Sequence, residues 1–221
     1  MRRHDHRHDP HGRSPRCWLA AARDAVGRQT WALLAVAALI GRPTVATAQE
    51  MAVPVDLQLT VFARALSYDR SLPQRAEGTL VMGIVYQREV RASVLAKDAV
   101  LAWVQSNAGA VSKQIDLKCV PIALTDTTDL RTAIQRHHVD VLYVAPLRSV
   151  NIGRITRVTR EERVLTLSGV ASYVRSGIAF GVDEEARRTR ILINLPASKD
   201  EGSDFTAQLL AVSQVIDGED E

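Results

Sequence analysis

The sequence predicts an α/β fold, built as a single three-layer domain in which helices cover both faces of a mainly parallel sheet. Two observations lead to this class. Short apolar runs alternate along the first half of the domain with segments whose apolar residues recur every three or four positions. Nearer the C-terminal end, two apolar runs flank a charged segment, which adds an antiparallel hairpin. A final amphipathic helix is expected after that hairpin.

Residues 1–48 are predicted to be a cleaved signal peptide with a long leader rich in His and Arg. The apolar run Trp31–Ile40 follows arginines and precedes Ala46 and Ala48, small residues that suit a peptidase cutting after Ala48. A membrane-spanning helix needs about 20 apolar residues, so a retained anchor is the weaker alternative. The expected domain then covers residues 49–217, and residues 218–221 form an acidic, frayed tail.

The charge of the chain belongs mostly to this leader. The leader holds eight of the 28 basic and three of the 25 acidic residues, which leaves 20 basic and 22 acidic residues in the exported part. That part is slightly acidic, so the composition does not indicate nucleic-acid binding. The leader also contains a His-rich tract of the metal-binding kind, which is expected to leave with it. Its members are His4, His6, His8 and His11.

The first half of the domain supplies the alternating elements. A helix over residues 55–66 follows from apolar positions spaced by four, three and four, and further helices are expected over 89–107, 130–138 and 151–162. Residues 125–129 contain candidate N-caps for the third of these helices. The predicted strands are "TLVMGIVYQ", "QIDLKCVPIAL", "VDVLYVAP" and "RVLTLSGV". Because Pro121 cannot donate to a ladder, the second strand is expected at an edge or to end there.

The stretch "GIAFGVDEEARRTRILINLPAS", residues 177–198, predicts the hairpin. Two alternating apolar runs are joined by the charged segment Asp183–Arg190, for which a loop of four or five residues is expected. Beyond it, apolar residues repeat at four, three and four positions, which predicts an amphipathic helix starting near Ser203 or Asp204. The repeating residues are Phe205, Leu209, Val212 and Ile216.

Catalytic and metal-binding patterns are missing from the exported sequence. Its two histidines, His137 and His138, are adjacent at a predicted helix end and do not share a helix face, so they make a poor metal site. The helix dipole explains them sufficiently. Neither a P-loop nor a dinucleotide-binding glycine pattern occurs. The sequence therefore predicts no catalytic residue, no metal and no cofactor.

Cys119 is the one cysteine that remains once Cys17 leaves with the leader, so no intramolecular disulfide is possible. It alternates with Ile115 and Leu117 along a predicted strand, which favours a buried position. An intermolecular bridge, and with it a homodimer, is the alternative.

Open α/β sheets bind ligands at the loops beyond the carboxyl ends of their strands. Polar residues in those predicted loops and in the hairpin loop are candidate contacts for a ligand or a partner, because arginine can hold an anion through paired hydrogen bonds. The alternative is that they are ordinary solvent-facing residues. The candidates are Arg88, Arg148, Ser149, Ser168, Tyr173, Arg187 and Arg188.

Four stretches, taken in order, resemble the YfiR-like family of secreted bacterial proteins. They are "VPVDLQLTVFARALSYDRSL", "VDVLYVAP", "VLTLSGVASYVRSGIAFGV" and "RILINLPASKDEGSDFTAQLLAVSQVI". The similarity runs from about Val53 to Ile216. Its most specific part is the end, where an "INL" strand precedes Thr206, Leu209, Leu210, Val215 and Ile216 at fixed spacing.

The resemblance implies a small periplasmic domain without catalytic activity. The best-known relatives bind the periplasmic sensor domain of a membrane-bound diguanylate cyclase and so lower cyclic di-GMP. Some relatives carry paired cysteines linked to redox control, which this sequence lacks. The implied partner is the periplasmic domain of a membrane signalling protein, a diguanylate cyclase or a sensor kinase. The rival hypothesis is a module resembling one lobe of a solute-binding protein, which binds an anion or an amino acid.

Overall fold

The structure is a computed structural model that describes residues 51–107, 109, 111, 115–125 and 129–217. The predicted signal peptide with its cleavage site, the His-rich tract and the acidic tail lie outside the described residues.

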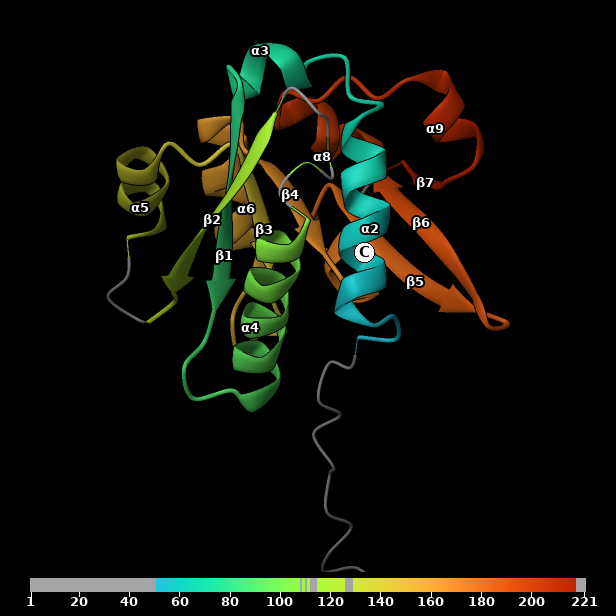
Figure 1. Cartoon of the computed structure of the whole chain (residues 1–221). Helices are drawn as coiled ribbons and strands as arrows, with labels where there is room; N and C mark the ends of the chain where they lie inside the picture. Colours follow the sequence, from blue (N-terminus) through green and yellow to red (C-terminus); the bar gives the residue numbers. More distant parts are fainter. Residues whose placement is uncertain (1–50, 108, 110, 112–114, 126–128, 218–221) are drawn as a thin grey trace, which may run out of the picture. The chain divides into compact units, whose positions relative to one another are not determined.

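The described chain forms one seven-stranded sheet in the order β2-β1-β3-β4-β5-β6-β7 (Figure 1). Neighbouring strands are parallel throughout, except for the antiparallel pair β5 and β6. The strands are β1 (Thr79–Tyr86), β2 (Asp116–Ala123), β3 (Val141–Val144), β4 (Leu165–Ser168), β5 (Phe180–Glu185), β6 (Arg188–Asn194) and β7 (Gln214–Ile216). The predicted mainly parallel α/β sheet with a late hairpin is confirmed.

Helices cover both faces of this sheet and produce the predicted three layers. On one face α2 and α4 bury residues such as Phe62 and Val100 in one apolar cluster, and on the other α5, α6 and α7 bury Ile134, Ile155 and Val174 in a second. The helices are α2 (Val55–Leu66), α3 (Leu72–Ala76), α4 (Arg91–Ser106), α5 (Leu130–His137), α6 (Ile152–Glu162), α7 (Ala171–Arg175), α8 (Leu195–Asp200) and α9 (Ala207–Ala211). Among the described helices, none combines the length and apolar character that a membrane span requires.

Local chemistry explains where the helices of the second face begin and end. Asp129 caps α5 by accepting a hydrogen bond from the Arg131 N–H (3.1 Å), and Asn151 caps α6 by accepting one from the Gly153 N–H (2.8 Å). His138 ends α5 in the left-handed conformation. Pro121 lies in β2, an edge strand, as its missing N–H requires.

The hairpin turn is shorter than expected. The last paired residues are Glu185 and Arg188, so the loop consists of Ala186 and Arg187, both with positive φ (50° and 62°). The prediction of a four- or five-residue loop was wrong because the charged residues on either side are strand residues. Opposite charges face each other across the ladder, which suits exposed strand positions.

The predicted final helix is also corrected. The short helix α8 ends before the predicted start, and the predicted helix is replaced by the short helix α9 and the strand β7, which pairs with β6. Asn194 starts α8 by accepting a hydrogen bond from the Ala197 N–H (3.1 Å). Val212, expected on the buried face, is 72% exposed, whereas Ile216 is buried in the sheet. Hydrogen bonding to the open edge of β6 thus overrides the helical spacing.

Candidate functional site

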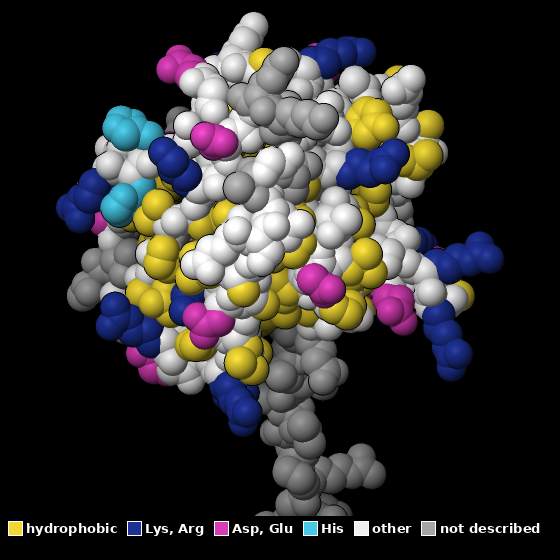
Figure 2. Space-filling model, in the orientation of Figure 1, with side chains coloured by type: hydrophobic (Ala, Val, Ile, Leu, Met, Phe, Trp, Pro, Cys, Tyr) yellow, Lys and Arg dark blue, Asp and Glu magenta, His cyan; other side chains and the backbone are white. Residues whose placement is uncertain are grey.

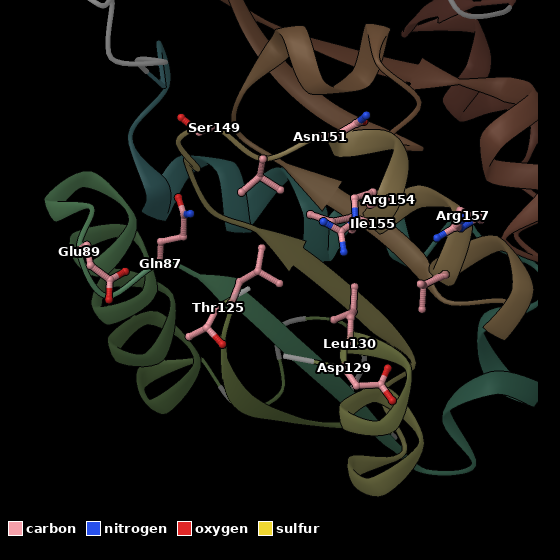
Figure 3. A pocket seen from close by; sticks show the side chains of 13 residues that line it. Gln87, Glu89, Thr125, Asp129, Leu130, Ser149, Asn151, Arg154, Ile155 and Arg157 are labelled. Atoms are coloured by element: carbon pink, nitrogen blue, oxygen red, sulfur yellow. The ribbon is translucent and has the colours of Figure 1, made fainter. Parts of the chain in front are cut away.

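The strand order creates a crevice between β1 and β3. The helix after β1, α4, lies on one face of the sheet, and the helix after β3, α6, lies on the other, so the two loops diverge at the carboxyl ends of the strands. Ligands of open α/β sheets bind at such a switch point. A cleft of about 560 Å³ opens there (Figure 3). Its lining consists of Gln87, Glu89, Leu124, Thr125, Asp129, Leu130, Ser149, Val150, Asn151, Arg154, Ile155, Arg157 and Val158.

Gln87 ties the two diverging loops together. Its side-chain carbonyl accepts a hydrogen bond from the Arg148 N–H (2.6 Å), and its amide donates to the Arg148 carbonyl (3.2 Å). The Gln87 N–H in turn donates to the Ser93 hydroxyl (2.9 Å), which joins the first turn of α4 to the loop. One side chain therefore sets the distance between the walls of the cleft.

The cleft carries charges of both signs together with apolar side chains. Arg154 and Arg157 of α6 line it together with Glu89 and Asp129 (Figure 3). In the part of the chain that the structure describes, neither arginine has a salt bridge. The apolar lining residues are Leu124, Leu130, Val150, Ile155 and Val158. Such a site suits a small molecule that has both an apolar body and a charged group.

Asp129, one of the acidic residues that line the cleft, is held as a carboxylate. Hydrogen bonds from the Thr132 side chain and from the main chain of Thr132 and Arg131 lower the pKa of Asp129. Ion pairs of Arg131 with Glu161 and Glu162 join α5 to α6 beside it. Asp129 is thus available as a fixed negative charge at neutral pH.

The remaining polar groups of the cleft can be placed along the chain. Ser149 is its hydroxyl group on the β3 side, and His137 and His138 lie at the opposite end of α5 from Asp129. Among the described residues, no group of three or more His, Cys, Asp or Glu side chains can hold a metal ion. The lining offers no nucleophile with a base beside it.

The structure brings one of the seven candidate residues into this cleft. Ser149 lines it, with a positive φ of 53° that turns the chain toward α6. Arg88 and Arg148 are exposed in the two loops that Gln87 joins, outside the lining. Arg148 contributes its main chain instead of its guanidinium.

Ser168 and Tyr173 are buried and bonded within the fold. The Ser168 hydroxyl donates to the Val144 carbonyl (2.9 Å) and accepts from the Val170 N–H (3.1 Å). The Tyr173 hydroxyl bonds to the Leu147 N–H (2.9 Å) and to the Leu147 carbonyl (3.2 Å), and burial raises its pKa. These two side chains shape the loop after β3 rather than facing solvent.

The other candidates lie outside the cleft lining. Arg187 and Arg188 are exposed at the tip of the hairpin, and Cys119 is a half-buried free cysteine on the edge strand β2. Burial raises the pKa of the Cys119 thiol to about 12.

Sequence reasoning did not single out Gln87, Arg154 and Arg157 as site residues. Their convergence depends on β1 and β3 being neighbours while their helices take opposite faces. The helix start at Asn151 was the available signal, because α6 places Arg154 and Arg157 one turn apart beyond it.

A second hollow, of about 790 Å³, runs along α4 beside the start of α2. Small and apolar side chains line it, among them Ala92, Ala99, Trp103 and Leu95, which is 57% exposed. Figure 2 shows apolar side chains gathered on this face of the molecule.

The fold is similar to those of solved structures. A conserved domain protein from Vibrio cholerae O1 biovar El Tor matches at 15% identity with a TM-score of 0.53, over 73% of this chain and 60% of that one. The ABC domain from Streptococcus pneumoniae, solved in complex with L-Trp, matches at 10% identity and a TM-score of 0.54, over 74% and 60%. A substrate binding protein with adhesive properties from Clostridium difficile matches at 16% identity and a TM-score of 0.49, over 67% and 58%.

These similarities concern the fold alone, and this chain spans about 60% of the length of the structures it matches. No curated protein matches the chain.

The comparison with family models gives a match on the sequence itself. The family described as YfiR/HmsC-like matches residues 73–214, from α3 into β7 and well over half of the chain. This span includes the hairpin, the "INL" strand and Thr206, Leu209 and Leu210 of the final spacing, and it ends before Val215 and Ile216. The expected kinship is confirmed, and the chain belongs to the YfiR/HmsC-like family.

Proposed function

We propose that this protein is a periplasmic, non-catalytic regulator that binds the extracytoplasmic domain of a membrane signalling protein and represses a diguanylate cyclase. The observation that carries the proposal is the match to the YfiR/HmsC-like family over residues 73–214. The predicted signal peptide is consistent with the periplasm, the compartment that the family implies.

Two features of the surface support a role in binding. The switch-point cleft holds charged and apolar side chains but no nucleophile with an adjacent base among the described residues. The hollow along α4 exposes apolar groups, including Leu95, and exposed apolar patches mark interaction sites.

The proposal is tested by deleting the gene and measuring cyclic di-GMP. Deletion is expected to raise cyclic di-GMP, and the full chain supplied in trans is expected to restore it. A chain that lacks residues 1–48 is the matched control, because it is retained in the cytoplasm and is expected not to restore it. The full chain should also co-purify with the membrane protein whose loss abolishes the effect. Unchanged cyclic di-GMP after deletion, with no membrane protein co-purifying, contradicts the proposal.

The switch-point cleft favours a second candidate function, the binding of a small anion or amino acid. Arg154 lines the cleft together with apolar side chains and has no salt bridge to described residues. A thermal-shift screen of organic anions and amino acids is expected to find a stabilising ligand whose effect is lost in Arg154→Ala. Arg88→Ala is the matched control, because Arg88 lies on the adjoining loop outside the cleft. Equal loss in both variants argues against this site.

A further inference from the structure

The outer half of the β5–β6 hairpin extends beyond its neighbouring strands. β4 pairs with β5 only at Phe180 and Gly181, and β7 pairs with β6 only at Leu192–Asn194. The remaining pairs, between residues 182–185 and 188–191, have no further strand on either side among the described residues. We call residues 182–191 the hairpin arm, which projects past the rest of the sheet in Figure 1.

One observed hydrogen bond shows which N–H groups of the arm point toward the other strand of the hairpin and which point away from it. The Asn194 N–H donates to the Ala179 carbonyl (2.9 Å), so this pair is a hydrogen-bonded pair of the antiparallel ladder. Such pairs alternate along the ladder, and the pair that closes the two-residue turn is again hydrogen-bonded. Thr189 and Ile191 fall between these pairs and therefore turn their N–H groups away from β5. β6 thus has a free edge that can donate to another strand.

The side chains along this edge are arranged by face. Arg188 and Arg190 point to one face of β6, and Thr189 and Ile191 to the other. Arg190 is bonded to Glu185 of the same hairpin (2.5 Å), whereas Arg188 has no salt bridge within the described part of the chain. Ile191 is half-buried against the apolar cluster of the α2 face.

The turn at the tip fixes this arrangement. Ala186 and Arg187 both have positive φ, the conformation of a tight two-residue turn, although neither is glycine or asparagine. Each such residue costs about 1 kcal/mol, and this strain is retained at the exposed tip of the arm. The turn holds the two strands of the arm in register.

We propose that the β6 edge of the hairpin arm, residues 188–191, receives an extended strand of another protein that carries an acidic side chain beside Arg188 and an apolar one beside Ile191. Main-chain hydrogen bonds to Thr189 and Ile191 supply the affinity, and the side chains select the sequence. The identity of the partner, an extracytoplasmic domain of a signalling protein, rests on the proposed function. The free edge of β6 and its charge do not depend on the proposed function.

The charges of the arm argue against a second copy of this chain. Two β6 edges that met would place Arg188 and Arg190 of one copy beside the same arginines of the other, and like charges side by side oppose pairing. The carboxylate that would attract them, Glu185, is already bonded within its own hairpin.

The probe is a short labelled peptide of alternating glutamate and valine, titrated into the purified chain. The control peptide has the same sequence with its backbone nitrogens methylated, so that it keeps the charge but cannot pair as a strand. The first peptide is expected to bind, with salt-dependent affinity, and to shift the NMR amide signals of Thr189 and Ile191. Equal binding of the methylated peptide overturns the proposal, as does the absence of binding.

Two variants of one cross-strand pair show whether the peptide binds at the β6 edge or at the β5 edge of the arm. Thr189→Pro removes an N–H from the β6 edge, and Glu184→Pro removes the N–H of its cross-strand partner on the β5 edge, which donates to the Asp183 carboxylate (2.8 Å). Thr189→Pro is expected to weaken binding by about tenfold or more, and Glu184→Pro by less than about twofold. An equal loss in both overturns the proposal.

A third variant, Arg188→Glu, keeps every backbone N–H. The proposal can therefore be tested even if Thr189→Pro fails to fold. Arg188→Glu is expected to shift the preference of the arm to a peptide of alternating lysine and valine. If Arg188→Glu still prefers the glutamate peptide, or if the chain self-associates through the arm, the arm does not receive an acidic strand of another protein. If cyclic di-GMP does not respond to deletion while the peptide still binds, the proposed function fails and the strand-binding edge stands.

Discussion

Glu201 is a carboxyl group buried completely at the end of α8, and it makes the stability of the domain depend on pH. Burial raises the pKa of Glu201 to about 7, against an ordinary value of 4.5, although several hydrogen bonds and Arg160 act in the opposite direction. It accepts from the Thr166 N–H (2.7 Å) and bonds to the hydroxyls of Thr159 (2.8 Å) and Thr166 (2.9 Å). The Thr166 hydroxyl also accepts from the Ala179 N–H (2.8 Å).

This network stays bonded when Glu201 is protonated. The Thr159 hydroxyl can donate to the Thr156 carbonyl (3.1 Å) and accept the Glu201 proton in exchange. The Thr166 N–H and hydroxyl continue to donate to the other carboxyl oxygen. Glutamine has nearly the same shape, with an acceptor oxygen and a donor group at the two ends of its amide, so Glu201→Gln is expected to fold and to mimic the neutral, protonated state.

The sign of the pH effect follows from the direction of the pKa change. Between pH 4.5 and about 7 the native chain binds more protons than the unfolded chain, so the free energy of unfolding falls as pH rises through this window. The pKa difference corresponds to about 3 kcal/mol. Glu201→Gln does not titrate. Its stability relative to the wild type should therefore increase by about 3 kcal/mol between pH 4.5 and pH 8.

Urea unfolding of the wild type and the variant at several pH values measures this difference, and groups that titrate in both proteins cancel. Glu184→Gln is the matched control, because it makes the same substitution at an exposed position of the hairpin. Glu201→Ala leaves the Thr166 N–H without its partner and should cost about 1 to 3 kcal/mol at low pH. If the wild type instead gains stability over Glu201→Gln as pH rises, the carboxylate is the form that the network holds, and the reasoning fails.

Three further predictions concern other parts of the fold. Tyr143→Phe removes the hydrogen bond that the buried Gln58 carbonyl accepts (2.8 Å) and should lower the free energy of unfolding by about 1 to 3 kcal/mol in urea titrations; no change would mean that Gln58 finds another donor. The pKa of about 12 leaves Cys119 about a thousandfold less thiolate than an ordinary cysteine at pH 8, so a thiol reagent should label the native chain far more slowly than the urea-unfolded chain, whereas equal rates contradict this burial. Replacing the turn by Ala186→Asn with Arg187→Gly should stabilise the domain by about 1 kcal/mol, read as a raised midpoint of thermal unfolding, and a lowered midpoint would show that the wild-type side chains stabilise the turn.

Most of the first half of the fold could be predicted from local patterns. The alternation of apolar runs and helical stripes located β1 to β4 and their helices, and Pro121 identified β2 as an edge strand. The C-terminal third was less predictable. Leu209 and Ile216 lie at helical spacing, yet one is in α9 and the other in β7, because the open edge of β6 offers hydrogen bonds that no local window reveals.

The sequence by itself determined the α/β class, the hairpin, the candidate N-caps and the family. Each of these follows from residues near one another in the sequence or from motifs that occur in a fixed order along the chain. Only the tertiary structure decided the switch-point cleft, because β1 and β3 become neighbours while α4 and α6 take opposite faces of the sheet. The free edge of the hairpin arm is equally a tertiary property. It exists because β4 and β7 end before β5 and β6 do.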